Sequence, residues 1–302
     1  MANDCVKIKV LYSNYGKFIE EWEEHMSEFR LCAFADEADP SIAGQISALK
    51  ENGIELIELR GVDGRNVTQL SADEMRELRV RLNDDGINVW SIGSPIGKVS
   101  VEDDFLAHLE LFRHTLELAV LAGAEKMRMF SFYVAPGKAE QSETQVIDRL
   151  GQMLELARNS GVMLCHENEK GIFGDTAERC ARLHKALPEL RAVYDPANFI
   201  QCGEDTLRAW EMLEPYIESM HMKDAEAYGT VVPAGEGVAD IPTLLKKYAA
   251  AGGGVITLEP HLSEFVGLAG LEREGEKSGI SCRYSGHREA FDAGVNALKA
   301  LM

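Results

Sequence analysis

The sequence predicts a closed barrel of eight parallel strands that alternate with helices, the (β/α)8 fold. Eight short apolar runs alternate with amphipathic stretches along the chain, and strict β/α alternation implies parallel strands. Eight such units in roughly 230 residues match the size of a closed barrel. A doubly wound sheet is the alternative, but it would not bring the ends of the last four strands onto one site so readily.

The first half of the barrel is predicted from strand-like runs that each precede a helical pattern. The helix over 71–86 has an N-terminal signature, because Ser71 is followed three residues later by Glu74, a capping box. The expected strands are 31–35, 54–59, 88–93 and 125–130, and the expected helices are 41–53, 71–86, 103–123 and 141–160.

The second half repeats the pattern. The expected strands are 162–167, 190–195, 217–223 and 254–259, and the expected helices lie near 175–187, 204–214 and 241–251. A final helix, 288–302, closes the barrel. We therefore interpret 31–302 as one barrel domain that includes a polar loop and this helix, and 1–30 as an N-terminal extension, a cap or a subunit contact, with a possible strand and an acidic helix.

Composition favours a globular enzyme and disfavours two classes of partner. Hydrophobic residues make up 45% and charged residues 27%, and the formal net charge is −19. Such a charge repels nucleic acid and anionic membrane surfaces. No apolar run approaches the roughly 18 residues of a membrane span, and no signal peptide is evident. We expect a cytoplasmic protein whose six scattered cysteines are buried thiols rather than a disulfide framework.

Four possible metal ligands each end one of the last four strands. They are Glu167, Asp195, His221 and Glu259. A single acidic residue at a strand end is often a cap, but four on adjacent strands favour a shared site at the barrel mouth. Three carboxylates and one imidazole suit one divalent cation, with Mn²⁺ favoured and Mg²⁺, Co²⁺ or Zn²⁺ as alternatives.

The chain resembles the xylose-isomerase-like TIM-barrel superfamily of sugar isomerases and epimerases, nearest to ketose 3-epimerases and inosose dehydratase or isomerase. The resemblance covers about residues 30–262 and is carried by HENEKG, YDPANF, HMKD, PAGEG and LEPHL. It implies a single-metal site formed by the same four residues, with Glu167 and Glu259 as the acid–base pair. Asn198 stands where the family often has a histidine, and we assign it to substrate hydroxyls.

The implied reaction removes a proton from a carbon beside a carbonyl. A divalent cation stabilises the resulting enolate charge, while one carboxylate takes the proton and a carboxylic acid on the other face returns one. Glu167 and Glu259 come from the fifth and eighth strands, so they are expected to flank the substrate.

Basic residues near the strand ends are further candidates for substrate binding. Lys223 lies two residues after His221 and faces the same side of its strand. The other candidates are Arg60, Lys98, Arg128 and His261, with Lys170 as part of a basic rim. Ion pairing is the competing interpretation: Lys223 with Asp224 or a ligand carboxylate, and the others with Glu58, Glu167 or Glu169.

The expected partner is a small sugar, sugar phosphate or cyclitol, with a homo-oligomer as a further possibility. A lyase of the same fold, an inosose-type dehydratase or a C-glycoside-cleaving enzyme, is the alternative function, because it begins with the same enolate. An abasic-site endonuclease ranks lower, since it needs extra histidines and its substrate is a polyanion. A non-catalytic binding barrel is disfavoured by the intact carboxylate pair.

Overall fold

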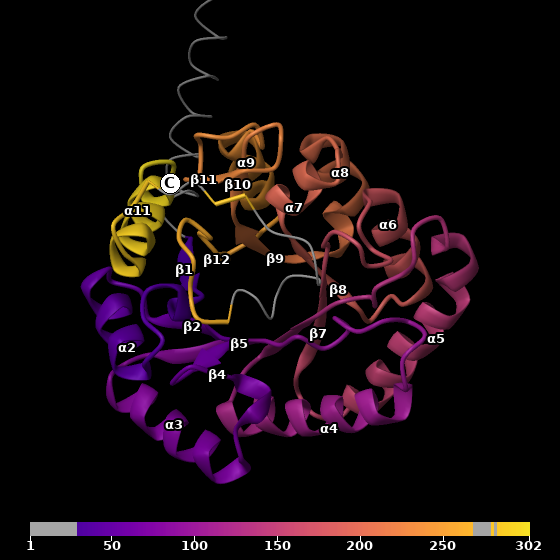
Figure 1. Cartoon of the computed structure of the whole chain (residues 1–302), viewed down its shortest axis with the longest axis horizontal. Coiled ribbons are helices and arrows are strands. Elements are labelled where there is room, and N and C mark those ends of the chain that lie inside the picture. The colour runs from indigo at the N-terminus through magenta and orange to yellow at the C-terminus, as the bar shows by residue number, and fades with distance from the viewer. Residues whose placement is uncertain (1–28, 268–278, 281–282) are drawn as a thin grey trace, which may run out of the picture.

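The computed structural model describes residues 29–267, 279–280 and 283–302. Eight strands form a closed barrel in the order β1-β12-β9-β8-β7-β6-β5-β2 (Figure 1). Every neighbouring pair in this barrel is parallel. The predicted fold class is therefore confirmed.

Each barrel strand begins and ends within two residues of the run that predicted it. The strands are β1 Arg30–Ala33, β2 Leu56–Leu59, β5 Asn88–Gly93, β6 Lys126–Met129, β7 Met163–Glu167, β8 Arg191–Tyr194, β9 Ile217–Met222 and β12 Val255–Leu258. The agreement follows from parallel strands that are covered on both faces, since these appear in the sequence as short apolar runs.

Helices surround the barrel in a ring (Figure 1). They are α2 Ile42–Glu51, α3 Ala72–Asp84, α4 Phe105–Ala122, α5 Ala139–Ala157, α6 Ala177–Ala186, α8 Thr206–Leu213, α9 Ile241–Ala250 and α11 His287–Lys299. The capping box of Ser71 and Glu74 is present at the start of α3. The predicted closing helix, α11, lies beside α2, where Arg288 Nη2 is 2.7 Å from Glu51 Oε2.

The loops hold shorter elements that the sequence interpretation did not include. The most informative is α7, Pro196–Gln201, which begins directly after β8 with Asp195 as its N-cap and proline in its first turn. The others are η1 Ala35–Glu37, β3 Gly61–Val62, β4 Arg65–Asn66, η2 Val67–Gln69, η3 Glu214–Tyr216, β10 Asp224–Ala225 and β11 Val231–Val232.

Apolar residues fill the layer between the strands and the helices, and polar residues fill much of the barrel interior. The apolar layer includes Phe112, Phe173 and Trp210, all nearly inaccessible to solvent. Barrel interiors are usually packed with branched apolar side chains. Here charged side chains lie buried in the interior instead, which marks it as the place to look for chemistry.

Three expectations concern residues outside the described part of the chain. The possible strand and acidic helix of 1–30, most of the loop before α11, and Cys5 and Cys282 fall there. The division into an extension and one barrel domain stays a prediction. Among the described residues the cysteines are free thiols, and no helix is long and apolar enough to cross a bilayer.

Candidate active site

The four predicted ligands meet at the carboxyl end of the barrel. Glu167 is the last residue of β7, Asp195 and Glu259 follow β8 and β12 directly, and His221 lies near the end of β9. One potential ligand atom from each lies within 4.8 Å of the others, and all four side chains are buried. Strand geometry alone places them there, because parallel strands of a closed barrel all end at the same rim.

Short contacts give these groups strongly shifted protonation equilibria. His221 Nδ1 lies 3.1 Å from Glu167 Oε1 and 3.5 Å from Glu259 Oε2. Burial alone would lower the pKa of His221, but the charges of Glu167 and Glu58 hold it well above its usual value. Burial alone would raise the pKa of Glu167, yet His221 and Arg128 hold it well below its usual range.

Asp195 differs from the other two carboxylates. Burial raises its pKa to about 7, Lys223 opposes that shift, and the negative charge of Glu167 adds to it. The pKa of Glu259 lies well below its usual range, because Lys223 and His261 outweigh the effect of burial. Glu167 and Glu259, the pair that the resemblance assigns to acid–base work, thus both have a lowered pKa, and Asp195 is the carboxyl group of this cluster whose pKa is raised.

Two asparagines hold the ends of β7 and β8 together. Asn168 Nδ2 donates to the carbonyl of Asp195 at 2.8 Å, and the amide of Asp195 donates to Asn168 Oδ1 at 2.9 Å. Asn198 Nδ2 donates to Glu167 Oε1 at 3.3 Å and to the carbonyl of Asn168 at 2.9 Å. The structure thus places Asn198, which we assigned to substrate hydroxyls, on a predicted metal ligand.

Two basic side chains contact the predicted ligands directly. Lys223 Nζ lies 2.9 Å from Asp195 Oδ2 and 3.1 Å from Glu259 Oε2. Arg128 Nη1 donates to Glu167 Oε2 at 2.5 Å. Of the two ion-pair partners considered for Lys223, the ligand carboxylates are present, while Asp224 accepts hydrogen bonds from four backbone amides of its own loop region.

A second group of possible ligands adjoins the first and shares Glu259 with it. Glu37, Glu259 and His261 present ligand atoms within 4.8 Å of one another. Arg60 donates to Glu259 Oε1 at 2.9 Å and to Glu37 Oε1 at 3.0 Å, and it is bidentate to Asp36. Cations contact the carboxylates of both groups, so we assign the metal to the first group because it has four converging ligands rather than three.

Of the other predicted rim residues, Lys98 pairs with Glu169 at 3.0 Å and lies over the ring of Phe130, and the backbone amide of Lys170 donates to Glu169 Oε1 at 2.9 Å. For Lys98 and Arg128 the structure thus contains the ion pairs to Glu169 and Glu167 that were the competing interpretation. His261, which has a positive φ of 44°, is held by its backbone amide, which donates to Glu37 Oε2 at 2.7 Å.

Glu58 of β2 belongs to the site although the sequence interpretation gave it only an ion-pairing role. His221 Nε2 lies 3.1 Å from Glu58 Oε2, and the hydroxyls of Thr257 and Ser91 donate to the Glu58 carboxylate at 3.0 and 3.1 Å. These partners lie 163, 199 and 33 residues away in sequence. The only available signal was a glutamate in the middle of an apolar strand.

The donor set fits a divalent cation. Within the described part of the chain, the buried atoms His221 Nδ1 and Asp195 Oδ2 make no hydrogen bond of suitable geometry, although Nδ1 lies 3.1 Å from Glu167 Oε1 and Oδ2 lies 2.9 Å from Lys223 Nζ. Three carboxylates and one imidazole are ligands typical of Mn²⁺, Co²⁺ and Zn²⁺. These two atoms, with Glu167 and Glu259, are the ones that would bind the ion.

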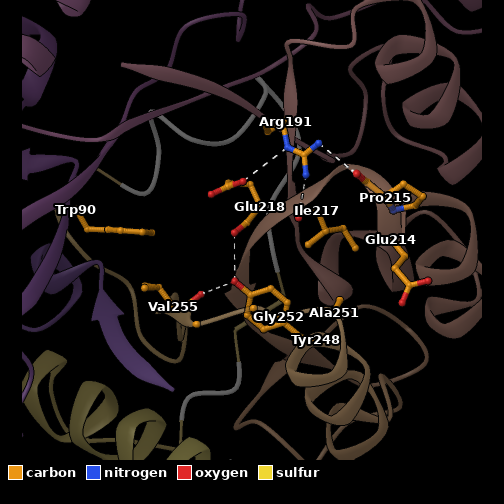
Figure 2. Close-up of a pocket in the computed structure, with 12 residues that line it drawn as sticks. Trp90, Arg191, Glu214, Pro215, Ile217, Glu218, Tyr248, Ala251, Gly252 and Val255 are labelled. Carbon is orange, nitrogen blue, oxygen red and sulfur yellow. Dashed lines mark hydrogen bonds and ion pairs between the residues drawn. The ribbon is translucent and has the colours of Figure 1, made fainter. Parts of the chain in front are cut away.

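A separate cavity of about 640 Å³ lies at the opposite end of the barrel (Figure 2). It is lined by residues from the beginnings of strands, including Trp90, Arg191, Glu218 and Val255. Neither group of possible metal ligands among the described residues includes a residue of this cavity. The features that predict catalysis are thus at the rim.

Comparison with known proteins agrees with the fold. A family model described as xylose isomerase-like TIM barrel matches residues 46–281. A search of curated proteins finds no match.

Solved structures of similar shape include two proteins named as enzymes and one with a bound metal. D-psicose 3-epimerase from Clostridium cellulolyticum H10, described with D-tagatose, has a TM-score of 0.71 at 12% identity. The IOLI protein with a bound zinc atom has a TM-score of 0.68 at 16%, and the probable 3-DHS dehydratase AsbF from Bacillus anthracis has 0.67 at 16%. Each comparison covers 90% of this chain and 98% of the other. At these identities the likeness concerns the fold.

Proposed function

Because the chain belongs to the xylose isomerase-like TIM barrel family, we propose that it is a divalent-metal-dependent isomerase or epimerase of a sugar, sugar phosphate or cyclitol. The observation that carries the proposal is the convergence of Glu167, Asp195, His221 and Glu259 at the carboxyl rim. Mn²⁺ is the ion we favour. The neighbour with a bound zinc atom supports a metal of this class in the same fold.

The proposed chemistry is the interconversion of two isomers through an enolate. A bound divalent ion would supply Lewis-acid stabilisation of the negative charge that develops on the substrate oxygen. Glu167 and Glu259 are separated around the barrel by β8 and β9, so their carboxylates approach a substrate from different directions. One removes the proton beside the carbonyl and the other returns a proton to the opposite face.

Basic residues at the rim would orient the substrate. Lys223 contacts both Asp195 and Glu259, so its ammonium is within reach of a substrate oxygen beside these ligands. Arg128 is buried, and its Nε and Nη2 have no hydrogen-bond partner within the described residues, so they remain available as donors. We propose that Lys223, Arg128 and Asn198 contact substrate, with Arg60, His261 and Lys98 as further candidates.

A lyase is the second candidate. A dehydratase of this fold begins with the same proton abstraction, and one structural neighbour is titled a probable dehydratase. His261 Nε2 lies 3.4 Å from Glu259 Oε1, which provides a further protic group at the site for a departing hydroxyl. In either case we propose a small-molecule substrate. We also propose a cytoplasmic location, with a homo-oligomer as a further proposal.

The deciding experiment is proton NMR in D₂O on Mn²⁺-loaded protein with ketoses, ketose phosphates and inososes. Deuterium entering beside the carbonyl, together with a new diastereomer or constitutional isomer, supports the isomerase or epimerase. Loss of a hydroxyl selects the lyase. If Glu167→Gln and Glu259→Gln both fold and exchange deuterium as fast as the wild type, the roles given to these carboxylates are refuted.

A further inference from the structure

Glu58 occupies an unusual position for a charged residue. It lies in the middle of β2, is 3% exposed, and points into the barrel beneath the predicted metal ligands. Its hydrogen-bond partners among the described residues are two hydroxyls and one imidazole, rather than the guanidinium or ammonium groups that contact the other carboxylates of the site. A buried carboxylate held this way is costly, so its contacts call for an explanation.

The contact with His221 provides one. An imidazole has nitrogens on opposite sides of the ring, and Nε2 of His221 is directed at Glu58 Oε2 at 3.1 Å. The ring is also fixed edge-on against Phe34, with centroids 5.1 Å apart at 86°. Nδ1 consequently faces the cluster, 3.1 Å from Glu167 Oε1.

Hydroxyl donors fix Glu58 in turn. Thr257 Oγ1 donates to the same Oε2 at 3.0 Å, and Ser91 Oγ donates to Oε1 at 3.1 Å. Thr257 lies on β12 two residues before Glu259, and Ser91 lies on β5. Three strands other than β9 therefore determine where the His221 ring points.

We infer that Glu58 is a positioning residue that holds His221 with its Nε2–H donated to a carboxylate and its Nδ1 lone pair available to a divalent cation. A carboxylate on the far nitrogen of a ligating histidine fixes the tautomer and increases the ligand's basicity. The inference rests on the proposed function only for the presence of the metal. Glu58 itself touches no ligand atom that would bind the ion.

The test is Mn²⁺ affinity of the metal-free full chain, measured by electron paramagnetic resonance titration. Glu58→Gln should weaken binding by roughly 10- to 100-fold, because the amide can present its NH₂ to the ring and favour the wrong tautomer. Thr257→Val keeps the shape but loses one donor to Glu58, and should weaken binding by roughly threefold. The visible spectrum of the Co²⁺-loaded protein should change in Glu58→Gln, since the imidazole ligand is displaced or reoriented.

The matched control is Glu218→Gln, another glutamate of the barrel strands, which pairs with Lys126 at 3.0 Å at the opposite end. It should bind Mn²⁺ as the wild type does. Wild-type affinity and an unchanged Co²⁺ spectrum in a folded Glu58→Gln would overturn the inference. If that variant does not fold, unchanged affinity in Thr257→Val overturns it instead. A wild-type chain that binds no Mn²⁺ overturns the proposed function. If the wild type binds Mn²⁺ and Glu58→Gln binds it equally well, only the inference about Glu58 fails.

Discussion

The two ends of the barrel interior both contain charged side chains, but they differ in burial and in the balance of charge. At the amino end Lys126 pairs with Glu218 at 3.0 Å and lies over the ring of Trp90 at 3.7 Å, and Arg191 is 3.7 Å from Glu218. At the carboxyl rim the buried carboxylates outnumber the Lys and Arg side chains in contact with them. The six carboxylates are Asp36, Glu37, Glu58, Glu167, Asp195 and Glu259, against Arg60, Arg128 and Lys223.

The difference indicates where a missing positive charge belongs. A buried carboxylate without a counterion is costly, so an excess of them is stable only if protons or a metal ion compensate. The raised pKa of His221 and the pKa of about 7 for Asp195 are the proton-based compensation in the metal-free chain. The amino end needs none, because its carboxylate, Glu218, contacts two basic side chains and is partly exposed to solvent.

The largest expected effect is on turnover, and it is tested by one substitution at each end of the barrel. Glu259→Gln should lower turnover by at least about 10³-fold, because it removes both a ligand and an acid–base group. Glu218→Gln, at the amino end, should leave turnover unchanged. Deuterium exchange rates on the substrate identified by NMR measure both, and equal losses in the two variants would remove the functional distinction between the ends.

The second prediction concerns the resident ammonium at the rim. Lys223→Met should lower kcat by about 10²-fold through loss of a donor to substrate. It should bind Mn²⁺ more tightly than the wild type, by up to roughly tenfold. The substitution removes a positive charge that contacts Asp195 and Glu259 and that repels the positive ion. Titration and steady-state kinetics measure the two effects. Weaker Mn²⁺ binding would mean that Lys223 supports the ligands rather than competing with the ion.

Removal of the metal should lower the stability of the folded chain because an ion is lost from the carboxyl rim. An ion at 100 times its Kd stabilises the folded chain by about 2.7 kcal/mol, which corresponds to several degrees in Tm. Thermal unfolding with and without Mn²⁺ should show this shift in the wild type and in Glu218→Gln. The shift should disappear in Glu259→Gln, and a persistent shift there would place the ion elsewhere.

The smallest expected effect is on the pH dependence of stability. It comes from buried histidines that lie outside the barrel interior. Burial lowers the pKa of His184 to about 4, so this ring stays neutral in the folded chain, with Nδ1 2.9 Å from the carbonyl of Leu190. The unfolded chain takes up the proton below about pH 6.5, so stability is complete above that pH and is lost as the pH falls towards 4.

His184→Gln keeps a donor for the Leu190 carbonyl but does not titrate. Between pH 8 and pH 5, the free energy of unfolding measured with urea should therefore decrease less in this variant than in the wild type. The difference should be on the order of 2 kcal/mol. Parallel pH dependences in the two proteins would show that His184 is not the group responsible. His166, whose pKa burial lowers to about 3, should behave in the same direction.

The parts of the site that could be predicted from the sequence are those fixed by local pattern. Glu167, Asp195, His221 and Glu259 each end an apolar run, and the fold then requires those ends to meet. The helix α7 could also have been expected, because Asp195 followed by Pro196 is an N-terminal helix signal. It was missed because PANFIQ is too short to show a clear period.

The parts that could not be predicted depend on contacts between distant strands. Glu58 meets His221 across 163 residues, and Arg60 meets Glu259 across 199. Which carboxylate a given cation selects depends on side-chain reach and competing donors, as the backbone amides around Asp224 illustrate. Sequence pattern assigns a residue to a face of its strand, but it carries no information about partners on strands so far along the chain.

Asn168 adds a rung to the β7–β8 ladder after both strands have ended. Its side-chain amide donates to the carbonyl of Asp195 and accepts from the amide of Asp195, the reciprocal exchange that two opposed residues make in an antiparallel pair, although β7 and β8 are parallel. The side chain therefore acts as a substitute peptide. Two hydrogen bonds thus continue the connection between β7 and β8 past the last strand residues, and they hold together the backbone that carries Glu167 and Asp195.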